Sequence, residues 1–325
     1  MKTNQPLISI VVPVYNEEEV LTEFHETVDK ALSKLPFDLE IVYINDGSTD
    51  NTLNIINVLG ANDKRITLID LSRNFGKEIA LTAGLHKAAG DAVVVIDADL
   101  QDPPELIPEL IKEWKNGYDV VYAKRTLRDG ESFLKKTTAH FFHRIIQRVG
   151  DFSIPEDTGD FRILSRRAVN ALNTFNEHHR FMKGLFAWIG FKQKAVPYKR
   201  HSRHAGKSKL NYWHLWNFAL DGITSFTIAP LKISTYVGTI TALSAFGYGI
   251  YMIIETLLHG NEVPGYPSLI VIILMLGGIQ LVAIGILGEY LGRIFNETKQ
   301  RPLYFINEYL PSDHAADKQA GNNNQ

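Results

Sequence analysis

The sequence predicts an α/β domain with a mostly parallel sheet, followed by two membrane-spanning helices. Apolar strand-like runs alternate with helix-like runs over residues 7–123, which is typical of parallel α/β folds. Acids and amides stand directly after several of these strand-like runs, where open parallel sheets collect their functional residues. Two later runs, residues 233–254 and 269–287, contain no charged residue, and each is close to the roughly 20 residues that a helix needs to cross a bilayer.

The overall composition is that of a globular protein. The chain has 325 residues, 45% of them hydrophobic and 22% charged, so a core can form without disulfide or metal cross-links. A formal net charge of −2 argues against a nucleic-acid binder. Because there is no cysteine, disulfides, thiolate nucleophiles and cysteine-bound zinc are excluded. The first apolar run is short, is interrupted by Pro13 and is soon followed by acids, so it is a poor signal peptide and we expect a cytoplasmic N-terminus.

The first strands and helices alternate in order along the chain. Residues 7–14, LISIVVPV, are apolar apart from Ser9 and predict a buried parallel strand. Residues 17–35 predict an amphipathic helix, and residues 39–46 the second strand. The apolar face of that helix comprises Val20, Phe24, Val28 and Leu32. Three residues of the next turn could cap the following helix: Ser48, Thr49 and Asp50.

The same alternation continues further along the chain. Three more strands are expected, at residues 65–71, 92–97 and 119–123. Two more helices are expected, at residues 77–90 and 103–117; the second has prolines at its start and Gly117 near its end. Beyond residue 131 the pattern is mixed, with one further strand at FRILS, residues 161–165.

Composition divides the chain into four parts. The α/β domain is expected over residues 1–208, an amphipathic segment over 209–230, the two spans with a short external loop over 231–292, and a cytoplasmic tail over 293–325. The last stretch of the tail, HAADKQAGNNNQ, is polar and lacks large apolar residues, so we expect it to be disordered.

The two uncharged runs are interpreted as membrane spans, although a buried helical hairpin would give the same pattern. The connector between them has no lysine or arginine, whereas four basic residues lie just outside the pair. These are Lys232, Arg293, Lys299 and Arg301. By the positive-inside rule, both ends of the chain are expected in the cytoplasm. Residues 209–226 carry three aromatics beside the first span and predict an interfacial helix, with a core helix as the alternative.

A pair of acids follows the fourth strand, in the stretch VVVIDADLQDPPEL. Asp97 and Asp99 would project from the same side of an extended chain. Carboxylates are the ligands that Mg²⁺ and Mn²⁺ prefer, and these ions keep positions for substrate phosphate. The pair therefore predicts a metal that holds a diphosphate, although acids at strand ends are also found merely solvated or capping a helix. At the neighbouring strand ends, Asp46 could accept hydrogen bonds from a nucleobase or ribose, and Tyr15 could pack beside it.

Six segments, in this order, resemble the polyisoprenyl-phosphate glycosyltransferases. The segments are VVPVYNEEE, INDGSTDNT, LSRNFGKEIAL, IDADLQDPPE, TGDFRILSR and GEYLGRIF. This family comprises inverting enzymes of GT-A fold, and within it the chain looks most like the bactoprenol glucosyltransferases. The resemblance covers about residues 8–305 and includes both spans.

The resemblance implies roles for particular residues. The uridine would lie among Pro13, Tyr15, Glu17 and Asp46. Ribose and a divalent metal, Mg²⁺ or Mn²⁺, would be bound by Asp97 and Asp99, with Gln101 as a further metal contact. Phosphate charge would be met by Arg125, Arg162, Arg203 and Lys207 or Lys209. Partners would be a UDP-sugar, with UDP-glucose favoured, a polyisoprenyl phosphate and the bacterial cytoplasmic membrane. Further copies of the chain would complete a homo-oligomer, for example a tetramer.

The implied reaction is a single displacement at the anomeric carbon. A catalytic carboxylate is expected in EDTGDFR, where Asp160 matches the family motif most directly and Asp157 is the competing choice. A lipid phosphate is already ionised near neutral pH, so neither acid has to be a strong base. Asp160 could instead orient the acceptor, contact a sugar hydroxyl, or only brace Arg162.

Other functions are less consistent with the sequence. A processive polysaccharide synthase would add spans and a Q-x-x-R-W motif, and a dinucleotide-dependent oxidoreductase would carry G-x-G-x-x-G after the first strand; the chain has neither motif. Alternative donors are UDP-galactose, UDP-GlcNAc, a nucleotide-linked aminoarabinose and GDP-mannose. The alternative to an enzyme is a non-catalytic scaffold or a flippase partner.

Overall fold

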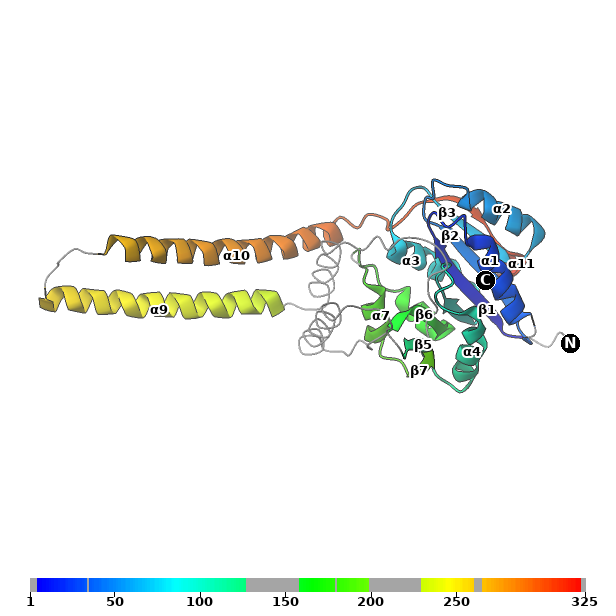
Figure 1. Ribbon diagram of the computed structural model, residues 1–325, viewed down its shortest axis with the longest axis horizontal. Helices are drawn as coiled ribbons and strands as arrows, with labels where there is room; N and C mark the ends of the chain where they lie inside the picture. The colour runs from blue at the N-terminus through cyan, green and yellow to red at the C-terminus, as the bar shows by residue number, and fades with distance from the viewer. Residues whose placement is uncertain are drawn as a thin grey trace. The chain divides into compact units, whose positions relative to one another are not determined.

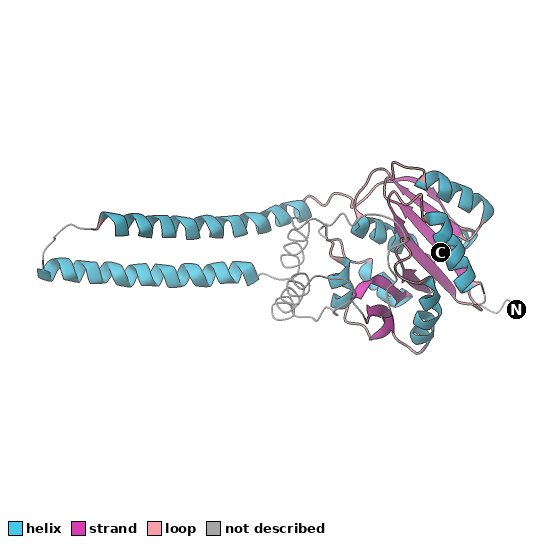
Figure 2. Ribbon diagram, in the orientation of Figure 1, coloured by secondary structure: helices cyan, strands magenta, loops and turns pink. Residues whose placement is uncertain are grey.

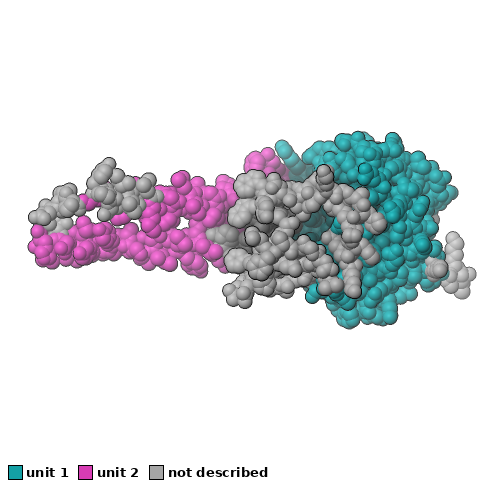
Figure 3. All heavy atoms as spheres, in the orientation of Figure 1, with its two compact units in different colours: residues 1–216, 301–325 teal, residues 217–300 magenta. Residues whose placement is uncertain are grey.

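A computed structural model divides the chain into two compact units, coloured separately in Figure 3. One unit comprises Met1–Trp216 and Arg301–Gln325, and the other comprises Asn217–Gln300. The structure describes residues 5–33, 35–126, 158–178, 180–198, 229–259 and 265–322. The segment expected as an interfacial helix, residues 209–226, lies outside these ranges.

The first unit is built on a mixed, mostly parallel sheet, drawn in magenta in Figure 2. In the described part of the chain, its strand order is β7-β5-β6-β4-β1-β2-β3-β8. The strands are β1 (Leu7–Val14), β2 (Asp38–Asn45), β3 (Ile66–Leu71), β4 (Ala92–Val95), β5 (Val120–Arg125), β6 (Thr158–Ser165), β7 (Gln193–Tyr198) and β8 (Ile306–Leu310). β6 and β8 run antiparallel to their neighbours. The predicted α/β class is therefore confirmed, and six of these strands overlap the expected ones.

The helices of this unit follow the strands as the alternation predicts (Figure 1). They are α1 (Leu21–Leu32), α2 (Thr52–Asn62), α3 (Lys77–Lys87), the 3₁₀ helix η1 (Pro104–Leu106), α4 (Ile107–Lys115), α6 (Arg166–Leu172), α7 (Met182–Trp188) and α11 (Asp313–Asn322). Of the three cap candidates before α2, Asp50 is the residue whose carboxylate accepts the Thr52 N–H, at 3.0 Å. Ser48 and Thr49 instead hydrogen-bond Asn16, in the loop after β1.

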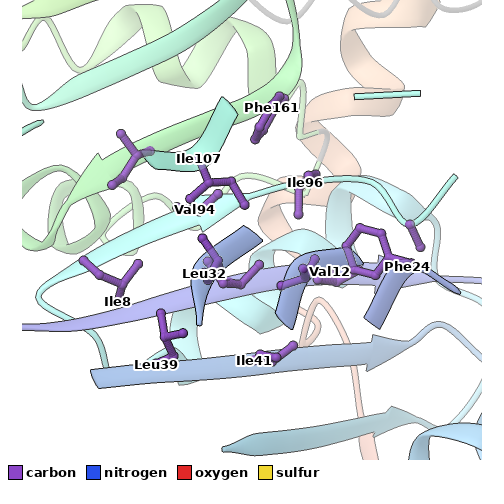
Figure 4. Packing of buried hydrophobic residues seen from close by; sticks show 14 of the residues in the cluster. Ile8, Val12, Phe24, Leu32, Leu39, Ile41, Val94, Ile96, Ile107 and Phe161 are labelled. Atoms are coloured by element: carbon purple, nitrogen blue, oxygen red, sulfur yellow. The ribbon is translucent and has the colours of Figure 1, made fainter. Parts of the chain in front are cut away.

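The core lies between one face of the sheet and helices α1 and α4 (Figure 4). Alternate residues of β1, among them Ile8 and Val12, pack with Phe24 of α1 and Ile107 of α4. Burying one such side chain contributes about 1.5–3 kcal/mol. On the other face α3 packs closely, because a methyl group at Gly84 would lie 2.5 Å from Val11 Cγ1.

The C-terminal segment returns to the sheet, which the sequence did not predict. β8 pairs antiparallel with β3, and α11 follows it. The Ser312 hydroxyl donates to the buried carboxylate of Glu40 at 3.3 Å, and Ala315 is buried. The expectation of disorder is thus wrong for residues 314–322, because strand pairing and small buried residues hold a segment that lacks large apolar side chains.

The second unit consists, in its described residues, of helices α9 (Ala229–His259) and α10 (Tyr266–Thr298). Two stretches, Leu231–His259 and Met275–Thr298, are long and apolar enough to cross a membrane, and neither is buried within the protein. Their exposed side chains include Leu243, Phe246, Leu281 and Leu287. A soluble core helix would bury such residues, so the membrane interpretation is favoured over the buried hairpin.

Candidate active site

The acids expected at the sheet edge are brought together by strand direction. β4 ends at Val95, so Asp97 follows at its carboxyl end, and β6 runs antiparallel beside it with Val95 opposite Arg162. Continuing that register two residues further sets Asp97 opposite Asp160. Asp97, which follows β4, and Asp160, near the start of β6, therefore lie at the same edge of the sheet.

The side chain that joins these two acids is Lys77, the first residue of α3. Its ammonium lies 2.7 Å from Asp97 Oδ1 and 2.6 Å from Asp160 Oδ2. Sequence analysis did not single out Lys77, because the contact with Asp160 spans 83 residues. A local signal existed, since a lysine at the positive N-terminal end of a helix is unfavourable there and needs another explanation.

The charges of this cluster shift its pKa values in opposite directions. Burial would raise the pKa of Asp160, but Lys77, Lys183 and Arg162 together hold it well below its usual range. Burial raises the pKa of Asp97, against the opposing effect of Lys77. Burial would lower the pKa of Lys77, but the Asp160 and Asp97 carboxylates outweigh it and raise that pKa. The cluster is thus two carboxylates that share one protonated amine.

Glu78 is a further acid next to this cluster. Burial, together with the charge of Asp160, raises the pKa of Glu78 to about 7. One of its oxygens accepts the Met182 N–H at 3.2 Å, which connects α3 to the start of α7.

Arg125 is held in place through Asp102, an acid of the loop after β4 that also carries Asp97 and Asp99. The Arg125 Nε donates to the Tyr198 hydroxyl at 3.2 Å, and that hydroxyl donates to the buried Asp102 carboxylate. Gly159 leaves room for this arrangement, because a methyl group there would lie 2.8 Å from Arg125 Nη2. Tyr198 and Asp102 were not among the predicted site residues.

Arg162 differs from the phosphate-facing position expected for it. Its side chain is buried, donates to the carbonyl oxygens of Gly159 (2.7 Å) and Asp160 (3.2 Å), and stacks on the Phe186 ring. Burial lowers the pKa of Arg162 to about 10. These contacts make Arg162 a positioning group for the backbone that carries Asp160.

Asp46 has a structural task in addition to the one expected of it. Its two carboxylate oxygens accept the N–H groups of Phe75 (2.7 Å) and Gly76 (2.9 Å), which fixes the loop before α3. That loop also lies against Gly47, where a methyl group would meet the backbone of Arg73 at 2.4 Å. Burial raises the pKa of Asp46, and the two N–H groups oppose that shift.

The loops after β1 and β2 are joined to one another. The Glu17 N–H donates to Thr52 Oγ1 at 2.9 Å, and Asn16, with φ of 55°, accepts from the Thr49 N–H at 2.8 Å. Next to them, Tyr15 is 42% exposed, so its ring is available to a ligand, and Pro13 lies within β1. This surface of two joined loops is where the uridine was expected.

The Asp99 turn is compatible with metal binding. Asp99 Oδ1 accepts the Gln101 N–H at 3.1 Å across a turn whose central residue, Leu100, has φ of 56°. Within the described ranges, no three histidine, cysteine or acidic side chains converge as a cation site. Asp160 Oδ1 is buried, however, and has no hydrogen-bond partner among the described residues. Hard oxygen donors with an unsatisfied carboxylate suit Mg²⁺ or Mn²⁺, whose remaining ligands a diphosphate and water would supply.

Four predicted residues lie outside the described ranges: Asp157, Arg203, Lys207 and Lys209.

Comparison with known proteins gives consistent results for both units. Residues 9–172 match the model of "Glycosyl transferase family 2", and residues 229–294 match "GtrB C-terminal hairpin". A bactoprenol glucosyl transferase of Shigella phage SfV is 50% identical over 92% of this chain and 97% of its own length. An uncharacterised glycosyltransferase of Synechocystis is 50% identical over 94% of this chain and 97% of its own. A solved mannosyltransferase from Pyrobaculum calidifontis, in complex with GDP-Man and Mn²⁺, superposes with a TM-score of 0.48 at 16% identity, covering 99% of this chain and 81% of that one.

Proposed function

The chain belongs to glycosyltransferase family 2, and from this premise we propose that it transfers glucose from UDP-glucose to a polyprenyl phosphate, with inversion at the anomeric carbon. The observation that carries this proposal is the 50% identity to a bactoprenol glucosyl transferase over 92% of the chain. That match is long enough to require both the sheet domain and the helical hairpin. The α/β architecture and the family match agree with the GT-A fold that the motifs imply.

We assign the donor to the carboxyl edge of the sheet. The joined loops that carry Tyr15 and Glu17 would receive the uridine, and Arg125 would face the diphosphate. A divalent metal held by Asp97, Asp99 and Gln101 would neutralise the charge that grows on the departing diphosphate. Since Tyr198 and Asp102 already restrain Arg125, little side-chain entropy remains to be lost when it meets an anion.

The acceptor side does not require a strong base. In the transfer, a phosphate oxygen of the lipid bonds to the anomeric carbon, and the bond from that carbon to UDP breaks with its electron pair leaving on UDP. The pKa of Asp160 is held low by neighbouring cations, so this carboxylate is ionised and weakly basic. We therefore assign Asp160 to orienting the sugar or the acceptor, while Asp157 keeps its role as the competing candidate.

The connections to the hairpin support action on a lipid. β7 is parallel to β5 and ends at Tyr198, and β8 begins at Ile306, opposite Leu71, the last residue of β3. Both segments that link the sheet to α9 and α10 therefore join it at the edge that carries Asp97. An enzyme tethered by this edge can act on a polyprenyl chain that cannot leave the bilayer, since each buried methylene contributes about 0.8 kcal/mol. By the positive-inside rule, the basic residues outside the helix pair support a cytoplasmic position for both chain ends.

The test uses purified protein in detergent with undecaprenyl phosphate. Radiolabelled UDP-glucose, UDP-galactose, UDP-GlcNAc and GDP-mannose are compared, each with Mg²⁺, Mn²⁺ or EDTA. We expect one glucosylated lipid that EDTA abolishes, and its loss in a folded Asp99→Ala variant, with Asp38→Asn at the opposite edge of the sheet as the unaffected control. Transfer of another sugar would show that the donor is not UDP-glucose. Full activity in EDTA would show that the reaction needs no metal. Donor binding without any transfer would favour a non-catalytic scaffold.

A further inference from the structure

Lys77 is a charged residue of the site to which the proposed reaction gives no role. Its ammonium donates to Asp97 at 2.8 Å and to Asp160 at 2.6 Å. Asp97 is a proposed metal ligand, so the amine takes up ligand oxygens that a metal would need.

The position of Lys77 is explained by these acids and not by its helix. It is the first residue of α3, where the positive end of the helix dipole disfavours a cation. Without the ammonium, Asp97 and Asp160 would face each other as two carboxylates with like charge. Before the donor binds, Lys77 therefore offsets the repulsion between the carboxylates of Asp97 and Asp160.

We propose that Lys77 is an internal counter-ion that makes metal binding depend on the nucleotide diphosphate. A divalent cation that approaches Asp97 meets the ammonium at short range and is repelled by it. The Lys77 side chain is 44% exposed, against 28% for Asp97 and 10% for Asp160, so it is the least buried side chain of the three and the one with most room to move. A diphosphate gives the displaced amine an anionic partner, and the metal and the donor then bind tightly only together.

This inference rests on the proposed function, because it takes a nucleotide diphosphate as the donor. It adds that one side chain, Lys77, contributes to the coupling between metal and donor. By thermodynamic reciprocity, UDP must tighten the metal as much as the metal tightens UDP.

The test measures Mn²⁺ binding and needs no turnover. Free Mn²⁺ is followed by electron paramagnetic resonance during titration of the purified full-length protein, with and without UDP. Lys77→Met keeps much of the side-chain stem and removes the charge; Lys77→Arg keeps the charge; Lys112→Met, on the exposed side of α4, is the control.

We expect Lys77→Met to bind Mn²⁺ without UDP about tenfold more tightly than the wild type, and to show a correspondingly smaller tightening by UDP. Lys77→Arg and Lys112→Met should keep the wild-type dependence on UDP. Equal donor-free Mn²⁺ affinity in Lys77→Met and the wild type would overturn the role of Lys77 while leaving the metal site intact. If neither protein binds Mn²⁺ even when UDP is shown to be bound, the metal site of the proposed function fails, and this inference fails with it.

Discussion

At the scale of single residues, the site is a set of charges that strand register brings together. The sequence motifs identified Asp97 and Asp160 because each stands in a recognisable local pattern. Lys77, Asp102 and Tyr198 could not be assigned in the same way, since their partners lie far away in the chain and are adjacent only in the fold. Arg162 was identified as important, but its burial against Phe186, which sets its role, depends on packing that no local pattern contains.

Gly159 should be required for the position of Arg125. A methyl group there would lie 2.8 Å from the guanidinium, which can move because it is the end of a flexible side chain. Gly159→Ala should therefore fold normally and lower kcat/KM about tenfold or more, by displacing Arg125. A double-mutant cycle checks this: in an Arg125→Ala background, Gly159→Ala should have almost no further effect, and full additivity would contradict the assignment.

Glu78 should make stability depend on pH. Its pKa in the folded protein, about 7, lies above the ordinary value of 4.5, so its contribution to stability is fully present below about pH 4.5 and is lost as pH rises through 7. Glu78→Gln keeps an acceptor for the Met182 N–H and removes the charge. The free energy of unfolding of Glu78→Gln, relative to that of the wild type, should therefore rise by on the order of 2 kcal/mol between pH 5 and pH 8. Thermal unfolding at each pH measures this, and parallel curves for the two proteins would exclude it.

At the scale of elements, the strands with continuous apolar runs were predictable and the edge strands were not. β1 and β4 are almost wholly buried and are apolar apart from Ser9, and β2 contains the apolar run IVYI at residues 41–44. β7 and β8, with the sequences QKAVPY and INEYL, are short and polar, as edge strands often are. Their pairing is decided by the backbone of β5 and β3, which a local pattern does not reveal.

Two helical glycines should respond in opposite ways to the same substitution. Gly84 of α3 faces the sheet, where a methyl group would lie 2.5 Å from Val11 Cγ1 and 2.7 Å from Ile44 Cδ1. Gly60 of α2 has only an ordinary contact, 3.7 Å from Ile66 Cγ2. We expect Gly84→Ala to destabilise the domain by about 1–3 kcal/mol and Gly60→Ala to stabilise it by about 0.5–1 kcal/mol. Thermal unfolding of the two variants side by side measures both, and a stabilising Gly84→Ala would contradict the close packing of α3.

At the scale of the whole molecule, the hairpin can be removed only if the C-terminal segment is retained. A truncation that ends before α9 would also delete β8, leaving the β3 edge unpaired and Glu40 without its Ser312 donor. Loss of activity in such a truncation would therefore not distinguish a membrane role from unfolding.

Replacing residues 229–298 with a flexible glycine-serine linker removes this ambiguity. We expect the variant to fold, to bind UDP with wild-type affinity, and to lose most transfer to undecaprenyl phosphate in vesicles. Calorimetry with UDP and a vesicle transfer assay measure the two properties. Undiminished transfer would show that the hairpin does not present the lipid to the site.

The pairing of β8 with β3 also has a consequence for biosynthesis. β8 follows both apolar helices in the chain, so a ribosome makes it after the whole hairpin has been synthesised. Until then, β3 remains an open edge of the sheet and Glu40 lacks one of its hydrogen-bond donors. The sheet domain therefore reaches its final form only after the second apolar helix has left the ribosome, which ties maturation of the enzyme to the step at which its membrane anchor becomes available for insertion.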